Sequence, residues 1–383
     1  MTERLTADVT IIGGGVAGCA AAVALRRAGI TVVLLEKGMC GAGASGVNFG
    51  GVRQQGRNLA ELPLARRSRE IWDRLAEMLG EDVEFQATGH IKLARSDADM
   101  EELERYAGDA AAHGLKLQML GANATRAELP WLGPKVVGAS LCAEDGAANP
   151  RLVGPAYARF ARRLGAEVRE QAPAIAAERA GEHFETRAEA LTITSRFLVN
   201  TAGIGAGTVA GWFGEEAPLG PVVPNMLVTE PLPAFVTRSV GVCGGDVYVR
   251  QVARGNVIMG GGRGWGDADL NTSRPVTDQS LAGMAKTLDL VPALKGASII
   301  RTWAGIDGEM PDRIPVIGFS ATTPNLVHAF GFSGHGFQLG PVVGEIIAEL
   351  ITEGRSASPL EPFAITRFAG MAEAPPASAG VEH

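Results

Sequence analysis

The sequence predicts an α/β fold in which a parallel-sheet domain is interrupted by a discontinuous α+β domain built on a mostly antiparallel sheet. Three observations predict it. An apolar run at 9–12 leads into a glycine-rich turn and an alanine-rich helix, which is the pattern of a buried strand followed by a helix. Two later apolar runs, 197–200 and 326–330, also end in small-residue turns and return the chain to this sheet. Between them, 221–301 is β-rich, with short strands joined by turns.

Composition and charge exclude several classes of protein. The chain has 383 residues, of which 46% are hydrophobic, and a formal net charge of −7, so we expect two domains and no nucleic-acid partner. No apolar run reaches the roughly 18 residues of a membrane span, and no signal-peptide pattern precedes the first strand, so we expect a cytoplasmic protein without a transmembrane segment. The four cysteines lack C-x-x-C spacing, so we expect neither a metal site nor a disulfide framework.

The turn after the first strand has the spacing of a dinucleotide-binding motif. Gly13, Gly15 and Gly18 follow the G-x-G-x-x-G pattern, in which the glycines allow a tight turn, a close approach to pyrophosphate and close helix packing. The N terminus of the following helix favours the negative charge of a phosphate. Glu36 ends the second strand, where an acidic side chain accepts ribose hydroxyls. We therefore expect a Rossmann-like domain that binds a dinucleotide.

We expect the chain to pass repeatedly between the two domains. The expected cofactor-domain segments are 1–83, 149–220 and 323–368, the expected substrate-domain segments are 84–148 and 221–322, and 369–383 is expected to be a disordered tail. The expected helices are 59–79, 101–113, 152–164 and 341–350, and the expected strands include 90–93, 246–250, 256–260 and 326–330.

Five blocks in order resemble the FAD-dependent D-amino acid oxidase superfamily. They are the opening motif with Glu36-Lys37, Gly43-Ala44-Ser45-Gly46, Asn200-Thr201-Ala202-Gly203, Trp303-Ala304-Gly305 with Pro311-Asp312 and Pro315-Val316-Ile317-Gly318, and Gly331-Phe332-Ser333-Gly334-His335-Gly336-Phe337. The pattern is most similar to sarcosine oxidases of the β-subunit type and to related secondary-amine oxidases and dehydrogenases. The resemblance implies an FAD-binding domain, with the flavin ring between the two domains. The implied FAD-binding residues are Gly13, Gly15, Gly18, Glu36, Lys37, Ala44, Ser45, Gly203, Gly334, His335, Gly336 and Phe337.

The resemblance also bears on how the flavin is held. Some relatives tether flavin to a late cysteine, but the last cysteine here is Cys243; others use a histidine in the loop 43–51 or near 149–150, and neither stretch contains one. We therefore expect non-covalent FAD. Backbone N–H groups of the loop 331–336 and the following helix N terminus would favour negative charge on the flavin ring. We expect a structural or ring-contacting role for His335, and no residue acting as an acid or base.

The substrate-binding residues are less defined. D-amino acid oxidase and glycine oxidase relatives hold the substrate carboxylate with an arginine where this chain has Asp307. Sarcosine oxidase relatives use an arginine after the flavin-facing loop, matched by Arg53, and a lysine at the position of Gln338, which is therefore also a substrate-binding candidate. Arg53 is therefore the first candidate for the carboxylate, and Arg250 or Arg263 could compensate for the missing lysine.

Other polar residues are candidates with a structural alternative. Gln54 and its neighbour Gln55 either bind substrate or flavin, or satisfy the loop's own backbone. Tyr248 and Arg250 share one strand face and are pocket candidates, although a half-buried tyrosine in a sheet is often only packing.

The function implied is flavin-dependent oxidation of the C–N bond of a small amino acid, preferably a secondary amine such as an N-alkylglycine, an imino acid or an iminodiacetate-like compound. The imine product would hydrolyse in water. The alternatives are a D-amino acid or 2-hydroxy-acid dehydrogenase of the same superfamily, or a non-catalytic FAD subunit. Oxygen or a partner electron-acceptor protein would reoxidise the cofactor, and a hetero- or homo-oligomer is compatible with the sequence.

Overall fold

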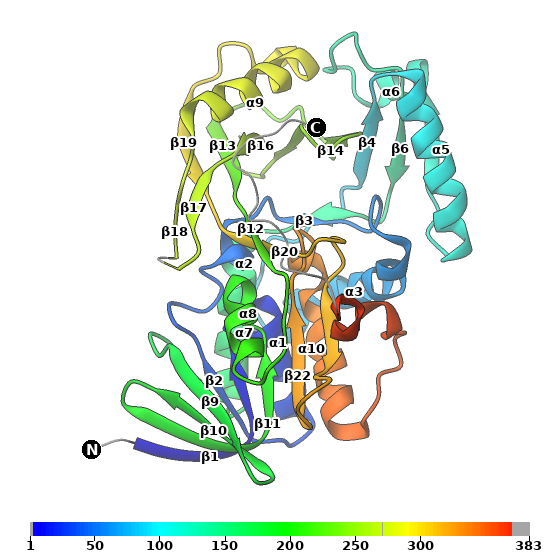
Figure 1. The fold of residues 1–383 in the computed structure, drawn as a ribbon. Helices are drawn as coiled ribbons and strands as arrows, with labels where there is room; N and C mark the ends of the chain where they lie inside the picture. Colours follow the sequence, from blue (N-terminus) through cyan, green and yellow to red (C-terminus); the bar gives the residue numbers. More distant parts are fainter. Residues whose placement is uncertain (1–2, 270, 370–383) are drawn as a thin grey trace.

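The computed structural model describes residues 3–269 and 271–369, and it shows two domains stacked end to end (Figure 1). Each domain is built on an eight-stranded sheet. In Figure 1 the sheet that contains the first strand lies at the bottom and the second sheet at the top, with α2 (Ala44–Val47) and β3 (Gly51–Val52) between them. The predicted fold class is confirmed.

The first sheet has the strand order β21-β22-β11-β1-β2-β8, and the β9–β10 hairpin pairs with the first half of β11. Strands β22, β11, β1, β2 and β8 are parallel, as expected for strands that alternate with helices. The bounds are β1 Glu3–Ile12, β2 Val32–Leu35, β8 Glu167–Arg169, β9 Ala174–Ala180, β10 His183–Ala188, β11 Leu191–Asn200, β21 Val316–Phe319 and β22 Leu326–Phe330.

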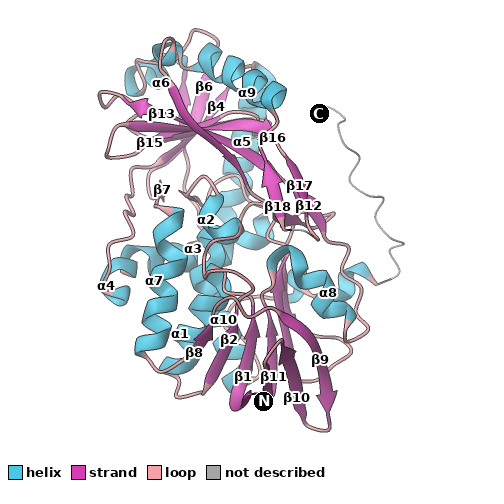
Figure 2. Ribbon diagram, turned by 90° about the vertical axis from the view of Figure 1, so that its left-hand side faces the viewer, coloured by secondary structure: helices cyan, strands magenta, loops and turns pink. Residues whose placement is uncertain are grey.

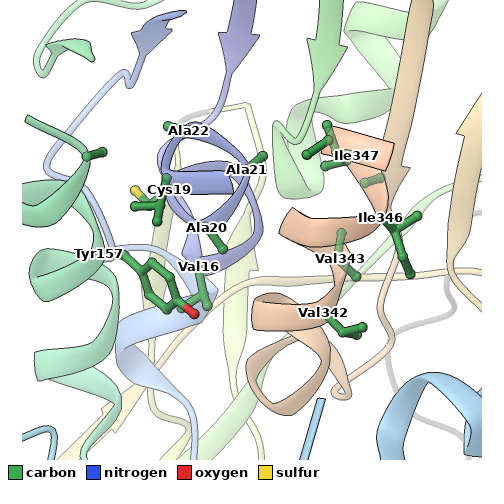
Figure 3. Close-up of a cluster of buried hydrophobic side chains, with 14 of the residues drawn as sticks. Val16, Cys19, Ala20, Ala21, Ala22, Tyr157, Val342, Val343, Ile346 and Ile347 are labelled. Atoms are coloured by element: carbon green, nitrogen blue, oxygen red, sulfur yellow. The ribbon is translucent and has the colours of Figure 1, made fainter. Parts of the chain in front are cut away.

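Both faces of this sheet are covered. The helices of the domain are α1 (Val16–Arg27), α3 (Leu62–Asp73), α4 (Leu75–Leu79), α7 (Pro150–Arg163), α8 (Ala206–Gly211) and α10 (Gly336–Glu353). Because side chains alternate along β1, Ile11 joins a core with α1, α7 and α10, whereas Ile12 packs with Phe184 of β10 and Val209 of α8. Figure 3 shows the first of these cores, where α1 lies between Tyr157 of α7 and the apolar side chains of α10.

Helix α10 begins at Gly336 and not at Pro341, so the expected start at 341 is wrong. A proline inside a helix removes one backbone hydrogen bond and typically costs roughly 3 kcal/mol. Tertiary packing offsets that cost. A Cβ on Gly344 would stand 2.4 Å from the Ala20 backbone, so α10 and α1 are in direct backbone contact.

The second sheet has the order β19-β13-β16-β15-β14-β4-β6-β5, and its pairs are antiparallel except β14–β4. Its bounds are β4 His90–Ala94, β5 Gln118–Gly121, β6 Gly138–Cys142, β13 Pro224–Pro231, β14 Ser239–Val242, β15 Tyr248–Gln251, β16 Asn256–Arg263 and β19 Ile299–Ala304. The domain's helices are α5 Asp97–Ala112, α6 Ala122–Glu128 and α9 Thr277–Leu290, and the small pairs are β3 with β7 (Gly146–Ala147), β12 (Gly220–Val222) with β20 (Asp307–Glu309), and β17 (Trp265–Asp267) with β18 (Thr272–Arg274).

Alternation along the strands gives this second sheet one apolar and one polar face. Ile91 and Val249 belong to the core on the outer side, where α6 and α9 lie (Figure 2). Their neighbours in sequence, His90 of β4 and Arg250 of β15, therefore point to the other side, toward the first domain. This polar face positions the candidate site.

Three expected features differ from the structure. The expected helix 59–79 consists of a 3₁₀ turn (Leu59–Glu61), α3 and α4, because Arg74 leaves the helical conformation (φ −110°, ψ 8°). Strand β21 already belongs to the first sheet, so the expected substrate-domain segment 221–322 includes a strand of the other domain. The expected tail 369–383 lies outside the described residues except for residue 369.

Candidate functional site

Backbone geometry explains two of the three motif glycines. Gly13 has φ +109°, and a Cβ there would lie 2.2 Å from the Thr201 carbonyl oxygen. A Cβ on Gly18 would lie 2.0 Å from the Gly13 carbonyl oxygen. Gly15 differs, because its Cβ would meet only the Ser45 hydroxyl oxygen, at 3.1 Å. The N terminus of α1 is therefore open beside Gly15, where a phosphate can approach the backbone.

The Glu36 carboxylate, just after the end of β2, bonds to the backbone of this turn. Its Oε2 accepts the Gly14 N–H at 2.7 Å, and its Oε1 accepts the Gly38 N–H at 2.7 Å. Each carboxylate oxygen can accept a further hydrogen bond, so Glu36 is held in place and remains able to accept ribose hydroxyls. The neighbouring Lys37 side chain is exposed.

Two other motif blocks adjoin the turn. The Ser45 hydroxyl accepts the Val16 N–H at 3.0 Å and so caps the first turn of α1, while Ala44 is the first residue of α2. On the other side, the Thr201 hydroxyl bonds the carbonyl oxygen of Gly13 at 2.9 Å, and Gly203, with φ +60°, begins the following 3₁₀ turn. We did not expect a role for Thr201 itself.

The glycine-rich loop 331–336 is held by a hydrogen bond to β20. The Asp307 carboxylate accepts the N–H of Gly334 at 2.8 Å, and burial raises the pKa of this carboxyl while its backbone hydrogen bonds oppose that shift. Gly334 and Ser333 both have positive φ, +86° and +52°, so the loop is sharply turned. The first turn of α10, beginning at Gly336, leaves its N–H groups without acceptors in the helix, which suits an electronegative ligand.

His335 precedes α10 and belongs to a buried charged cluster. Its Nδ1 lies 2.9 Å from Oε2 of Glu61, whose side chain is fully buried, and Nη1 of Arg57 lies 3.8 Å from Oε1 of the same carboxylate. Burial, together with the positive charge of Arg57, lowers the pKa of His335 to about 4, although Glu61 opposes the shift. The imidazole is therefore neutral at pH 7. Because Nδ1 donates to the carboxylate, Nε2 is a hydrogen-bond acceptor.

The cluster continues to Arg53, whose positive charge also lowers the pKa of His335. Arg53 is half-buried, and its Nη1 donates to the Gln55 carbonyl oxygen. Gln54 is buried, and its backbone N–H and side-chain amide both donate to Asp145, at 2.8 and 3.2 Å. The structure thus favours the structural alternative for Gln54, because its hydrogen bonds are used inside the protein.

Tyr248 and Arg250 approach from the second sheet. The Tyr248 ring packs edge-on against Phe49 at 4.9 Å, and burial raises its pKa to about 12. Nε of Arg250 donates to the Phe49 carbonyl oxygen at 2.6 Å, and burial lowers the pKa of this guanidinium to about 10. Both residues therefore contact the segment that follows α2.

The side chains of Phe337 and Gln338 point into the packing of α10 on α3. Phe337 lies 5.2 Å from the Trp72 ring, and the Gln338 amide donates to the Ala65 carbonyl oxygen at 2.7 Å. Phe337 can therefore reach a cofactor only through its backbone. The amide nitrogen of Gln338 is engaged by α3, whereas its buried amide oxygen has no hydrogen-bond partner among the described residues; substrate binding by Gln338 stays a prediction.

The structure thus brings Arg53 and His335 into one cluster, and it places Arg250 of the other domain against Phe49 and Gly50. Sequence reasoning missed Arg57 and Glu61. Their spacing of four residues was a signal for an ion pair, but only the tertiary structure shows that it is buried beneath His335.

Two absences concern only residues 3–269 and 271–369. Within them, no group of three or more His, Cys, Asp or Glu side chains is arranged to hold a metal ion. The helices in the same ranges include none that is long and apolar enough to cross a membrane.

A Rossmann-like parallel sheet with a glycine-rich turn at the N terminus of α1 is the architecture of a dinucleotide-binding domain. The chain belongs to the FAD-dependent oxidoreductase (DAO) family, whose model matches residues 8–350. This confirms the superfamily expected from the motif blocks.

Three similar proteins cover nearly the whole chain. An opine oxidase subunit of Rhizobium meliloti is 28% identical over 374 residues, covering 94% of this chain and 97% of that protein. The glycine oxidase of Geobacillus kaustophilus is 28% identical over 381 residues, covering 97% and 99%. The crystal structure of L-proline dehydrogenase from P. horikoshii has a TM-score of 0.89 and 27% identity, covering 96% and 98%.

The cofactor of this family is FAD, and the residues present fit it. The open side of Gly15 suits the pyrophosphate, Glu36 suits the adenosine ribose, and the first turn of α10 suits the electronegative edge of the flavin ring. That the FAD is not covalently attached remains a prediction.

Proposed function

We propose that this protein oxidises the C–N bond of a small amino acid, and that its preferred substrate is a secondary amine: an N-alkylglycine, an imino acid or an iminodiacetate-like compound. The names of its relatives support amino-acid chemistry. Proline and opines carry a secondary amine and glycine a primary one, so the relatives include both classes. The motif resemblance to sarcosine oxidases favours the secondary amine.

The observation that carries the proposal is the environment of Arg250. Its side chain is only 7% exposed, and among the described residues no acidic side chain forms an ion pair with it. The charge of Glu84 raises the pKa of this guanidinium, but less than burial lowers it. A buried cation without an anionic partner is costly, and an anionic ligand relieves that cost. Arg250 lies on the face that meets the cofactor domain, so the carboxylate of an amino acid is the anion we expect there.

Arg53 is the second carboxylate candidate. It shares its loop with the buried network of Gln54, and Lys92 of β4 lies close to the same turn, since both side chains are within 4 Å of a Cβ built on Gly56. Two arginines approaching from different domains could hold one carboxylate between them, or two carboxylates of a dicarboxylic substrate. Tyr248 would form an apolar wall beside Arg250.

The chemistry divides between cofactor and chain. Bound FAD supplies the acceptor for the hydride that leaves the carbon next to nitrogen. The arginines orient the carboxylate, Tyr248 and Phe49 exclude water, and the neutral His335 offers an acceptor beside the glycine loop. The imine that forms is released and hydrolyses in water to an amine and a carbonyl compound.

The terminal electron acceptor is either oxygen or a partner protein. The name of the opine oxidase relative designates a subunit, which makes a multi-subunit assembly a reasonable form for this protein. Comparing oxygen uptake with the reduction of an artificial dye by the purified protein decides between the two acceptors.

The test is product analysis with the purified holoenzyme. We expect sarcosine, proline isomers, iminodiacetate or opines to yield a carbonyl compound and an amine, or a cyclic imine from proline, and 2-hydroxy acids to give no product. Turnover restricted to 2-hydroxy acids, or to primary D-amino acids, would instead assign one of the alternative activities. Absence of turnover on every compound, with FAD fully bound, would favour a non-catalytic subunit.

A further inference from the structure

A chain of buried hydrogen bonds runs behind the Thr201–Gly203 turn. It joins Asn200 at the end of β11, His328 in the neighbouring strand β22, and Glu215 in the segment after α8. Asn200 and His328 are fully buried, and Glu215 is 7% exposed. The asparagine amide nitrogen lies 3.2 Å from Nδ1 of His328, and Nε2 of His328 lies 2.7 Å from Oε2 of Glu215.

Each bond in this chain has only one workable direction. The amide nitrogen of Asn200 is a donor, and it also donates to the Ala206 carbonyl oxygen at 3.0 Å, so it cannot be exchanged with the amide oxygen. Nδ1 of His328 must then accept, and Nε2 must donate to Glu215. The ring is the neutral Nε2–H tautomer.

Both ends of the chain are anchored to backbone N–H groups. The Asn200 amide oxygen accepts the Ala202 N–H at 3.3 Å, and Oε1 of Glu215 accepts the Ala321 N–H at 2.7 Å. Burial raises the pKa of Glu215, but the bonds it accepts outweigh that effect and lower the pKa, so the group is a carboxylate at neutral pH.

The Thr201–Gly203 turn packs directly against the glycines of the nucleotide motif. The Thr201 N–H donates to the Ile12 carbonyl oxygen at 2.9 Å, and the Thr201 carbonyl oxygen occupies the space next to Gly13 that a Cβ would need. The Thr201 hydroxyl likewise stands 2.7 Å from a Cβ built on Gly18. A displacement of this turn therefore breaks the hydrogen bonds by which Thr201 holds the carbonyl groups of Ile12 and Gly13.

A buried carboxylate facing a neutral imidazole has no opposite charge to offset its desolvation, so its presence calls for a role other than stability. We propose that Glu215, His328 and Asn200 are positioning residues for FAD, which fix the Thr201–Gly203 turn against the nucleotide motif and so set how tightly the cofactor is held. None of the three needs to touch FAD. The proposal rests on FAD binding and is independent of the substrate.

The sharpest variant is Glu215→Gln, which keeps the size of the side chain. The two N–H donors that Glu215 serves, from His328 and Ala321, both need acceptors, and a glutamine amide offers an oxygen to only one of them. We expect diluted holoenzyme to release FAD at least tenfold faster, measured by the rise of flavin fluorescence, and the FAD dissociation constant to rise by a similar factor.

Ile193→Val is the matched control. Ile193 is fully buried in the same strand as Asn200, at the opposite end, and its truncation loosens the sheet without touching the turn. The two variants are compared for thermal unfolding after removal of FAD and for FAD release. We expect the control to release FAD at the wild-type rate even where its unfolding temperature falls as far as that of Glu215→Gln.

Two results would overturn the proposal. One is FAD release from Glu215→Gln within twofold of wild type. The other applies even if that variant fails to fold: nitrogen NMR of wild-type holoenzyme labelled at histidine should show the His328 ring proton on Nε2 and none on Nδ1, and a proton on Nδ1 would remove the basis of the proposal.

Discussion

The nucleotide turn and the substrate-facing sheet are built in opposite ways. At the turn, the residues that matter are glycines and backbone N–H groups within one short stretch, and Gly13 and Gly18 are required because any Cβ would strike a carbonyl oxygen. On the substrate side, Arg53 and Arg250 come from different domains, and each acts through a long side chain. Cofactor binding is therefore a property of local backbone geometry, and substrate choice is a property of side chains that the fold brings together.

The largest expected effect concerns the attachment of FAD. The four cysteines are all buried, and the sequence places no cysteine or histidine where relatives tether flavin. Acid precipitation of the holoenzyme should therefore leave essentially all of the yellow colour in the supernatant. Colour that stays in the washed pellet would show a covalent bond and would contradict this prediction.

The second largest effect is expected on FAD content, when the open space beside Gly15 is filled. Gly15→Val places a branched side chain where pyrophosphate must approach the backbone, so we expect the variant to fold and to purify with little FAD. Glu36→Ala, which removes the ribose acceptor, should also lower FAD content. Gly211→Ala is the matched control, because a Cβ there meets nothing within 4 Å. Full FAD loading of both Gly15→Val and Glu36→Ala would mean that the dinucleotide lies elsewhere.

Removing Arg53 tests the substrate-binding side of the comparison. Loss of a buried charged partner typically costs roughly 2–5 kcal/mol, so Arg53→Ala should raise the substrate dissociation constant by one to several orders of magnitude, at ~1.4 kcal/mol per decade. FAD content should stay near normal. The readout is the substrate dependence of anaerobic flavin reduction.

The matching variant is Arg250→Ala. A steep rise in dissociation constant there with none in Arg53→Ala would assign the carboxylate to the second sheet alone. If neither variant changes the constant, the carboxylate is recognised by other residues and these two arginines have no role in binding.

A smaller effect is expected on stability in acid. The pKa of His335 is about 4 in the folded protein, against about 6.5 when unfolded. Above pH 6.5 both states are neutral and stability is unaffected; as pH falls toward 4 the unfolded state binds a proton that the folded state does not, which removes up to about 3 kcal/mol. Denaturant unfolding of His335→Gln should show a shallower loss between pH 6.5 and 4. An unchanged slope would mean that His335 titrates normally.

Much of the fold and of the cofactor site could be predicted because their signals are local. The spacing of Gly13, Gly15 and Gly18 and the position of Glu36 lie within one strand-helix-strand unit, and each constraint acts on nearby backbone. Pro341 shows the limit of this reasoning. A local rule placed it at the start of a helix, and close packing of α10 on α1 overrode the rule.

The remaining site residues could not be predicted, because their partners are far away in the chain. Glu61 lies beneath His335, and Asp145 takes the hydrogen bonds of Gln54. Neither pairing has a periodicity or a motif, since the first depends on how α10 packs beside the segment before α3 and the second on how the two domains meet. Arg250 was a candidate from its place on a strand, but its burial without an ion-pair partner is visible only once its surroundings are known.

The measurement that tests the central claim most directly is anaerobic reduction of the bound FAD by matched acids that differ only at one group: glycine, N-methylglycine and glycolate, with alanine, N-methylalanine and lactate as a second series. We predict that in at least one series the secondary amine bleaches the flavin fastest, the primary amine more slowly and the hydroxy acid not at all. Bleaching by the hydroxy acids in preference to both amines would contradict the account.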